Sequence, residues 1–110
     1  MKAVLAQIAP ALGDLGRNLK IHLEEIRLAV RAGAELIVFP ELSLTGYLLQ
    51  DLVSECAQET GRSPYIKELA RASQDIAIVA GFVEQAPGII YHNSAGCFMG
   101  GKLADRKSVV

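Results

Sequence analysis

Glu41 is the side chain best placed to do chemistry, because it ends the most apolar stretch of the chain. The run 36–39 and Pro40 precede it, and Leu42 and Leu44 follow it. An ionised carboxylate beside a core strand is costly unless a partner or a raised pKa compensates. Pro40 ends the strand, so Glu41 stands at its carboxyl end, the edge where open α/β sheets bind ligands. A solvated turn is the plain alternative for this acid.

Lys107 is the second candidate, and it belongs to a basic Arg-Lys pair. A lysine near Glu41 would offset the burial of the acid, and its ammonium group could stabilise the oxyanion of a tetrahedral intermediate. The alternative is a solvated lysine on a strand. Gly100-Gly101 suits a two-residue hairpin, and counting back from this turn predicts that Lys107 lies opposite Ser94.

The cysteines and histidines form no metal or redox pattern. Cys56 and Cys97 lie in dissimilar contexts without a C-x-x-C motif, and no histidine stands at ligand spacing, so neither a disulfide framework nor a zinc site is predicted. We expect Cys97 to be a buried core thiol and Cys56 to have no catalytic role. His22 and His92 are expected to be ordinary side chains rather than bases. No cofactor is expected.

The bulk properties indicate one domain that binds a small molecule. A chain of 110 residues buries roughly two-thirds of its surface on folding, enough for a single domain. Hydrophobic residues make up 51% and charged residues 21%, which excludes disorder. The formal net charge of -1 does not indicate binding to nucleic acid or to an anionic membrane. The absence of a long apolar run and of a signal-peptide pattern favours a cytoplasmic protein.

Alternating strand and helix patterns predict an α/β fold with a helix on one face of the sheet. Asp14 is a helix N-cap, Gly33 a helix stop, and Ser63-Pro64 the start of a second helix. In the first helix Leu19, Leu23, Ile26 and Val30 recur at helical spacing on the apolar side. The expected strands are 3–8, 36–39, 76–83, 91–99 and 102–110, and the expected helices are 15–32 and 63–73, with a short one within 48–57.

The stretch 39–47, FPELSLTGY, resembles the glutamate motif of the nitrilase superfamily, the carbon-nitrogen hydrolases that act on nitriles and amides. All nine contiguous positions match. The resemblance implies a Glu, Lys and Cys triad on an α-β-β-α sandwich. It makes Glu41 the general base and places Tyr47 near the substrate pocket. It also implies a homo-oligomer and a small amide or nitrile as the substrate.

The stretch 100–107 resembles the superfamily segment that ends in the catalytic lysine, here Lys107, and Asn93-Ser94-Ala95 resembles a motif of the preceding strand. The family often continues after this lysine with His-Leu or Leu-Leu-Pro, whereas this chain continues with Ser108-Val109-Val110. The nucleophilic Cys of the family lies some tens of residues beyond the lysine, and no position of this chain matches it.

These resemblances predict that residues 1–110 are the amino-terminal part of a carbon-nitrogen hydrolase domain, truncated before the nucleophile and inactive alone. The expected fold is the amino-terminal half of an α-β-β-α sandwich, a mixed sheet with helices packed on one face. Two other functions stay open. One is the glutaminase domain of a glutamine-dependent NAD synthetase, which the Lys-Ser-Val-Val end suggests. The other is a noncatalytic α/β module that binds a partner through its sheet.

Overall fold

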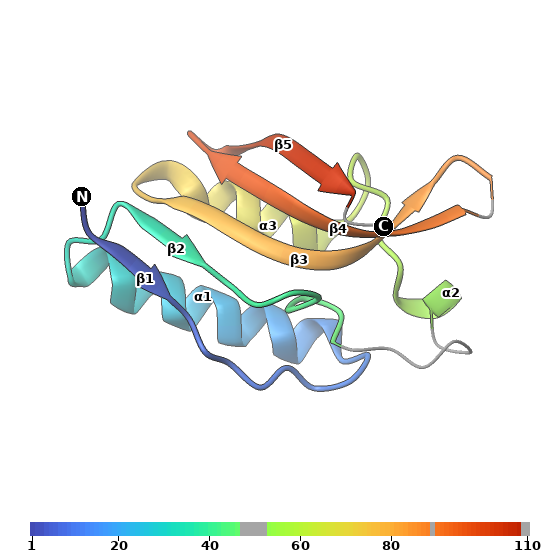
Figure 1. The fold of residues 1–110 in the computed structure, drawn as a ribbon, viewed down its shortest axis with the longest axis horizontal. Helices are drawn as coiled ribbons and strands as arrows, with labels where there is room; N and C mark the ends of the chain where they lie inside the picture. Colours follow the sequence, from blue (N-terminus) through green and yellow to red (C-terminus); the bar gives the residue numbers. More distant parts are fainter. Residues whose placement is uncertain (47–52, 89, 109–110) are drawn as a thin grey trace.

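Five strands form one mixed sheet in the computed structural model, which describes residues 1–46, 53–88 and 90–108 (Figure 1). The strand order is β1-β2-β3-β4-β5; β1, β2 and β3 are parallel, and β4 and β5 each run antiparallel to the strand before them. The elements are β1 (Ala3–Leu5), α1 (Leu15–Arg31), β2 (Leu36–Val38), α2 (Val53–Cys56), α3 (Pro64–Arg71), η2 (Ala72–Gln74), β3 (Ala77–Ala86), β4 (Ile90–Met99) and β5 (Lys102–Ser108).

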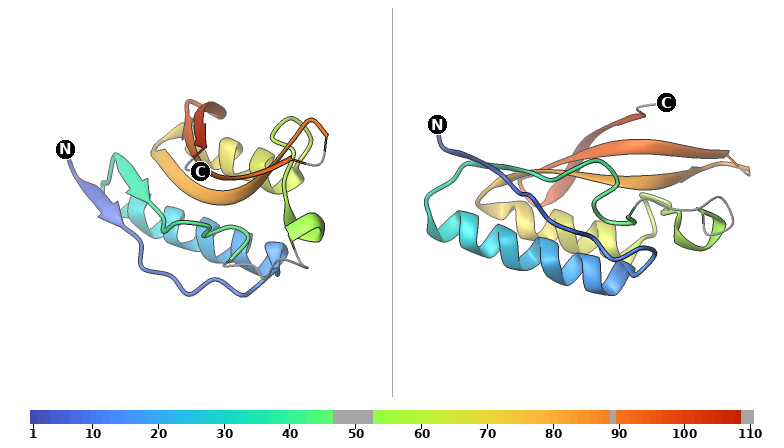
Figure 2. Two further views of the ribbon diagram at one scale, coloured as in Figure 1. Left: turned by 45° about the vertical axis from the view of Figure 1, so that its right-hand side comes forward. Right: turned by 60° about the horizontal axis from the view of Figure 1, so that its bottom comes forward.

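Helices α1 and α3 pack against the same face of this sheet, as the sequence predicts (Figure 2). We call it the helix face; Ile78, Ala80, Phe82 and Phe98 point into it and join the core residues of α1 and α3. Successive side chains of a strand point to opposite faces. The alternate residues, among them Gly81, Asn93 and Ala95, therefore lie on the other side, which we call the open face.

Both predicted helix starts are confirmed. The carboxylate of Asp14 accepts a hydrogen bond from the Arg17 N–H at 3.1 Å, and the Ser63 hydroxyl accepts one from the Ile66 N–H at 3.1 Å. Each cap satisfies a backbone donor that the first turn leaves without a partner, which is why these helices begin where they do. None of the helices in the described ranges is long and apolar enough to cross a membrane.

The buried side of α1 differs from the expected apolar side. Asn18, His22, Ile26 and Ala29 are buried, whereas Val30 is 37% exposed. The prediction holds for Ile26 and for Leu19, which packs against the core, and it was wrong for Val30. It also missed the buried Asn18 and His22, because this part of the helix faces a loop whose groups need polar partners.

The strand ends also differ from the expected ones. β1 ends at Leu5, and β3 continues to Ala86. The longer β3 is supported beside Glu84 by Gln58, whose N–H donates to Val83 O at 2.8 Å and whose carbonyl accepts from the Gln85 N–H at 2.9 Å. Glu84 is thus a strand residue, with its side chain on the helix face.

Candidate functional site

Glu41 lies in a loop, residues 40–46, that continues the pairing of β2 along β3. We call it the Glu41 loop. The Phe39 N–H donates to Val79 O at 2.8 Å, and the Leu44 N–H donates to Gly81 O at 2.8 Å. Leu42 has a φ of 53°, a left-handed conformation that costs a non-glycine residue about 1–2 kcal/mol. Glu41 therefore stands at the carboxyl end of β2, as predicted, in a tightly specified turn.

Strand β3 admits the Glu41 loop because residue 81 is glycine. A Cβ at Gly81 would lie 2.3 Å from Leu42 N and 3.1 Å from the carbonyl carbon of Glu41. Both are backbone atoms, so no side-chain rotation could relieve the clash. The sequence signal for this contact was a glycine inside an apolar strand pattern, which often marks a close backbone approach.

A layer of buried polar side chains holds the Glu41 loop from the helix side. The amide of Asn18 donates to Leu44 O at 2.9 Å and to Ala11 O at 2.7 Å, and its oxygen accepts from the Ala11 N–H at 2.7 Å. His22 Nε2 lies 2.9 Å from Ser43 Oγ, which also accepts from the Gly81 N–H at 3.2 Å. The loop is thus fixed to both α1 and β3.

His22 is a buried, neutral histidine, where the sequence predicted an ordinary side chain among charges. The carbonyl oxygen of Asn18, 2.6 Å from Nδ1, can only accept, so Nδ1 carries the hydrogen and Nε2 accepts from the Ser43 hydroxyl. Burial lowers the pKa of His22 below its ordinary value of 6.5, although the hydrogen bond to the Asn18 carbonyl acts in the opposite direction. The ring also packs on Phe39, with a centroid distance of 4.2 Å.

Asn93 on β4 is the direct partner of Glu41. Its Nδ2 donates a short hydrogen bond to Glu41 Oε1. The two residues line a cavity of about 290 Å³ together with Gly81 and Ala95, among others. In the sequence Asn93 belongs only to a strand motif, and no local signal indicates its contact with an acid on a distant segment. The Oδ1 atom of Asn93 is buried and has no hydrogen-bond partner within the described part of the chain.

Lys107 lies on the open face, in one row with Gly81 and Ala95. Gly81 pairs with Ala95 across β3 and β4, and Ala95 pairs with Lys107 across β4 and β5. Residues directly opposite each other share a face of the sheet. The Glu41 loop covers one end of this row at Gly81, and Lys107 stands at the other end, about 10 Å away across two strand spacings.

The predicted partner of Lys107 was wrong by one residue. Met99 does pair with Lys102, but the register shifts between Phe98 and Cys97, so that Ser94 faces Ser108 instead of Lys107. The additional residue of the bulge is Ala104. Because a shift by one residue turns every following side chain to the other face, a regular hairpin would have put Lys107 on the helix face.

The bulge reconciles two requirements of β5. Leu103 pairs with Phe98 and packs into the core of the helix face, whereas Lys107 lies on the open face. Residues four apart share a face of a regular strand. One additional residue between them is therefore needed, and bulges commonly redirect side chains in this way.

Glu41 and Lys107 share a face but form no ion pair with each other. Both side chains are exposed, so the expectation of a buried acid neutralised by the lysine was wrong in this chain. The physical reason is that the loop carries Glu41 out over the open face, where water solvates the carboxylate and Asn93 orients it.

The remaining predicted residues fall in different places. Cys97 is half-buried and pairs with Asp105 and Val79, which places it on the open face and corrects the expected core thiol. Cys56 is buried, and its thiol lies 3.8 Å from Gly13 O, away from Glu41. Tyr47, predicted near the substrate, lies outside the described residues.

Comparison with known proteins identifies the family. The carbon-nitrogen hydrolase family matches residues 2–108. The chain belongs to the carbon-nitrogen hydrolase family. This confirms the resemblance to the nitrilase superfamily and the predicted fold class.

Two curated relatives of this carbon-nitrogen hydrolase chain are glutamine-dependent NAD(+) synthetases. The protein from Thermotoga maritima is 34% identical over 86 residues, covering 76% of this chain and 15% of its own length. The protein from Acinetobacter baylyi is 33% identical over 100 residues, covering 91% of this chain and 18% of its own length. The chain thus spans less than a fifth of either relative.

A solved structure of a branch 10 nitrilase-superfamily member from Saccharomyces cerevisiae shares the fold, with a TM-score of 0.83 and 23% identity. It aligns with 100% of this chain, which covers 44% of that protein.

Replacing Gly81 by Ala is predicted to displace the Glu41 loop. The added Cβ meets backbone at 2.3 Å, so the free energy of unfolding should fall by about 1–3 kcal/mol, as for overpacked cores. Urea unfolding measures this loss. Gly16→Ala is the matched control: its Cβ meets nothing within 4 Å, and alanine should stabilise the exposed start of α1 by about 0.5–1 kcal/mol. Equal effects of the two substitutions would contradict the close approach.

His22 makes stability depend on pH. Its pKa in the folded chain is lower than in the unfolded chain, so the unfolded state binds the proton first and stability falls as pH drops below about 6.5. The free energy of unfolding should therefore decrease between about pH 7.5 and about pH 5.5 through this group. Urea titrations of the wild type and His22→Gln test this; an equally steep loss in the variant would reject the assignment.

Proposed function

We propose that the protein carrying this chain hydrolyses a small amide, with the side-chain amide of glutamine as the favoured substrate, and that Glu41 and Lys107 are two of its catalytic residues. The family membership supports hydrolysis of a carbon-nitrogen bond. The two curated relatives are named for their dependence on glutamine, and their names favour glutamine over other small amides as the substrate.

The observation that carries the proposal is the row Gly81, Ala95, Lys107 on the open face. Gly81 and Ala95 have little or no side chain, so they leave a shallow floor between the Glu41 loop at one end and the ammonium group at the other. The cavity at Glu41 is lined by the same two small residues. Glu41 lines this cavity, and Lys107 stands on the same face two strands away, an arrangement that suits proton transfer on one side and charge stabilisation on the other.

The proposed reaction uses a cysteine from outside residues 1–110, consistent with the small share of the relatives that this chain covers. Glu41 takes the proton of the thiol as the sulfur attacks the amide carbon. Lys107 stabilises the negative charge on the carbonyl oxygen, and Glu41 returns the proton to the departing nitrogen, which leaves as ammonia. Glu41 then takes a proton from water as the water oxygen attacks the thioester. The C–S bond breaks, and Glu41 returns the proton to the departing sulfur, which releases the carboxylic acid and restores the thiol.

Replacing Glu41 by Gln in the full-length protein is predicted to lower kcat for ammonia release from glutamine by about 10²- to 10⁴-fold, the usual contribution of a general base. Replacing Lys107 by Met should lower kcat by about 10²- to 10³-fold, as for other oxyanion-stabilising groups. Both residues are exposed, so the melting temperature should change little. Glu68→Gln on α3, another exposed acid, is the matched control. Full activity of Glu41→Gln would instead favour the noncatalytic binding module.

Cys97 provides a second test, because it lies on the same face as Lys107. The proposal places the nucleophile outside this chain, so Cys97→Ala in the full-length protein should keep kcat within about twofold, a change of less than 0.5 kcal/mol in the barrier. Residues 1–110 alone should release no ammonia from glutamine. A loss of all activity in Cys97→Ala, or thiol-dependent hydrolysis by the isolated chain, would make Cys97 the nucleophile and refute this part of the proposal.

A further inference from the structure

Glu84 carries a buried charge on the helix face, on the side of the sheet away from the proposed site. Its side chain is only 9% exposed. One carboxylate oxygen accepts a hydrogen bond from Ser94 Oγ at 2.8 Å, and the other forms an ion pair with the Nε of Arg106. Each carboxylate oxygen thus has a partner, and removing either partner would leave a buried charge uncompensated, which is costly in free energy.

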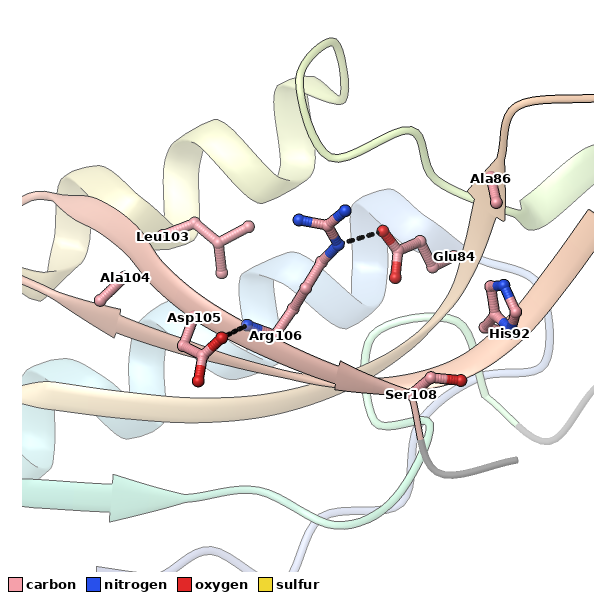
Figure 3. A pocket seen from close by; sticks show the side chains of 8 residues that line it. All are labelled: Glu84, Ala86, His92, Leu103, Ala104, Asp105, Arg106 and Ser108. Carbon is pink, nitrogen blue, oxygen red and sulfur yellow. Dashed lines mark hydrogen bonds and ion pairs between the residues drawn. The ribbon is translucent and has the colours of Figure 1, made fainter.

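Arg106 reaches this acid across a whole strand. Arg106 lies on β5 and Glu84 on β3, with β4 between them. Figure 3 shows the two side chains pointing toward each other. Both line a hollow of about 500 Å³. The residue of β4 opposite Arg106 is Gly96, which has no side chain to block the path. The ion pair therefore ties the end of β5 to β3 at a fixed register.

Arg106 and Lys107 are neighbours on one strand, so they must point to opposite faces. In the observed register Arg106 lies on the helix face and Lys107 on the open face. A hairpin without the bulge would exchange them, and it would also turn the exposed Asp105 toward Gly96 and the apolar core. The two registers differ by a single residue, so the protein needs a feature that selects one.

We propose that the ion pair of Glu84 and Arg106, with the hydroxyl of Ser94, selects the bulged register of β5 and thereby directs Lys107 to the open face. Glu84 and Arg106 are then positioning residues. The consequence for catalysis rests on the proposed amide hydrolysis, whereas the consequence for strand register does not. An ion pair on one face of the sheet thus controls a side chain on the other.

Strand register can be measured directly with cysteine pairs in the full-length protein. Asp105 lies opposite the native Cys97 in the bulged register, so Asp105→Cys should form a disulfide with it. Directly opposite residues have Cα atoms about 4.5–5.5 Å apart, within the range that a disulfide spans. In the regular register residue 108 would lie opposite residue 93, so the pair Asn93→Cys and Ser108→Cys reports that register. Mass spectrometry of unreduced peptides identifies each link.

The decisive comparison removes both charges of the ion pair. The double variant Glu84→Gln, Arg106→Met leaves no unpaired buried charge and is therefore expected to fold. In this background the ratio of the 97–105 link to the 93–108 link should fall at least about tenfold, which corresponds to 1.4 kcal/mol. The control Glu68→Gln, Arg71→Met removes an exposed ion pair of α3 in the same way and should leave the ratio unchanged.

The outcomes separate the proposals. An unchanged ratio in the folded Glu84→Gln, Arg106→Met variant, or no 97–105 link in the parent, overturns the register role. If the ratio falls, kcat of the Glu84→Gln, Arg106→Met variant for amide hydrolysis should fall as much as that of Lys107→Met, with KM within about twofold. The proposal is also overturned if this double variant retains its kcat while Lys107→Met is impaired. An active Lys107→Met would refute the catalytic assignment while leaving the register measurement valid. Arg106→Lys, which keeps the cation, should restore most of the ratio.

Discussion

The contact between two backbones at Gly81 is the constraint on which the site depends. The Glu41 loop lies so close to β3 that Gly81 both accepts a hydrogen bond from the Leu44 N–H and donates one to the Ser43 hydroxyl. Any side chain at this position would separate the two segments. Glu41 is therefore placed by main-chain geometry rather than by the packing of its own exposed side chain. A group fixed in this way loses little conformational entropy when it acts on a substrate.

The polar interior of α1 follows from the same contact. Beyond Val38 the chain leaves the regular ladder, and its backbone groups turn toward the helix. Asn18 donates to Leu44 O in the loop, the Ser43 hydroxyl accepts from the Gly81 N–H of β3, and His22 holds that hydroxyl. Each of these side chains is fully buried. Apolar residues at these positions would leave buried carbonyl and N–H groups without partners, at a cost of about 1–3 kcal/mol each. The network thus stabilises a loop that strand pairing alone could not hold.

Local rules predicted much of this fold. Asp14 and Ser63 begin their helices as expected, and the hairpin at Gly100-Gly101 forms with Met99 opposite Lys102. The expected features that failed depend on contacts between distant segments. His22 is buried because Ser43, 21 residues later in a loop, bonds its imidazole, and no periodicity along α1 reveals that contact.

The two predicted catalytic residues illustrate the same division. The position of Glu41 at the end of a strand could be inferred from Pro40 and the apolar run before it. Its bond to Asn93 could not, because that contact joins segments 52 residues apart. For Lys107, the turn at Gly100-Gly101 predicts correctly only the pairs next to the turn, such as Met99 with Lys102. A bulge at Ala104 has no strong local signal, since alanine suits regular and bulged strands alike.

The order Arg-Lys on β5 suits the two faces that these residues serve. Glu84 is buried and offers one oxygen to a cation, a task for the guanidinium group, which is weakly hydrated and binds carboxylates with fixed geometry. In the proposed reaction the open face requires a charge that can approach a developing oxyanion, and the ammonium group is a compact point charge on a flexible stem. Because neighbouring side chains alternate, an Arg106 that reaches the buried acid leaves Lys107 on the open face. In the proposed mechanism a contact on the helix face thereby places a catalytic group on the open face.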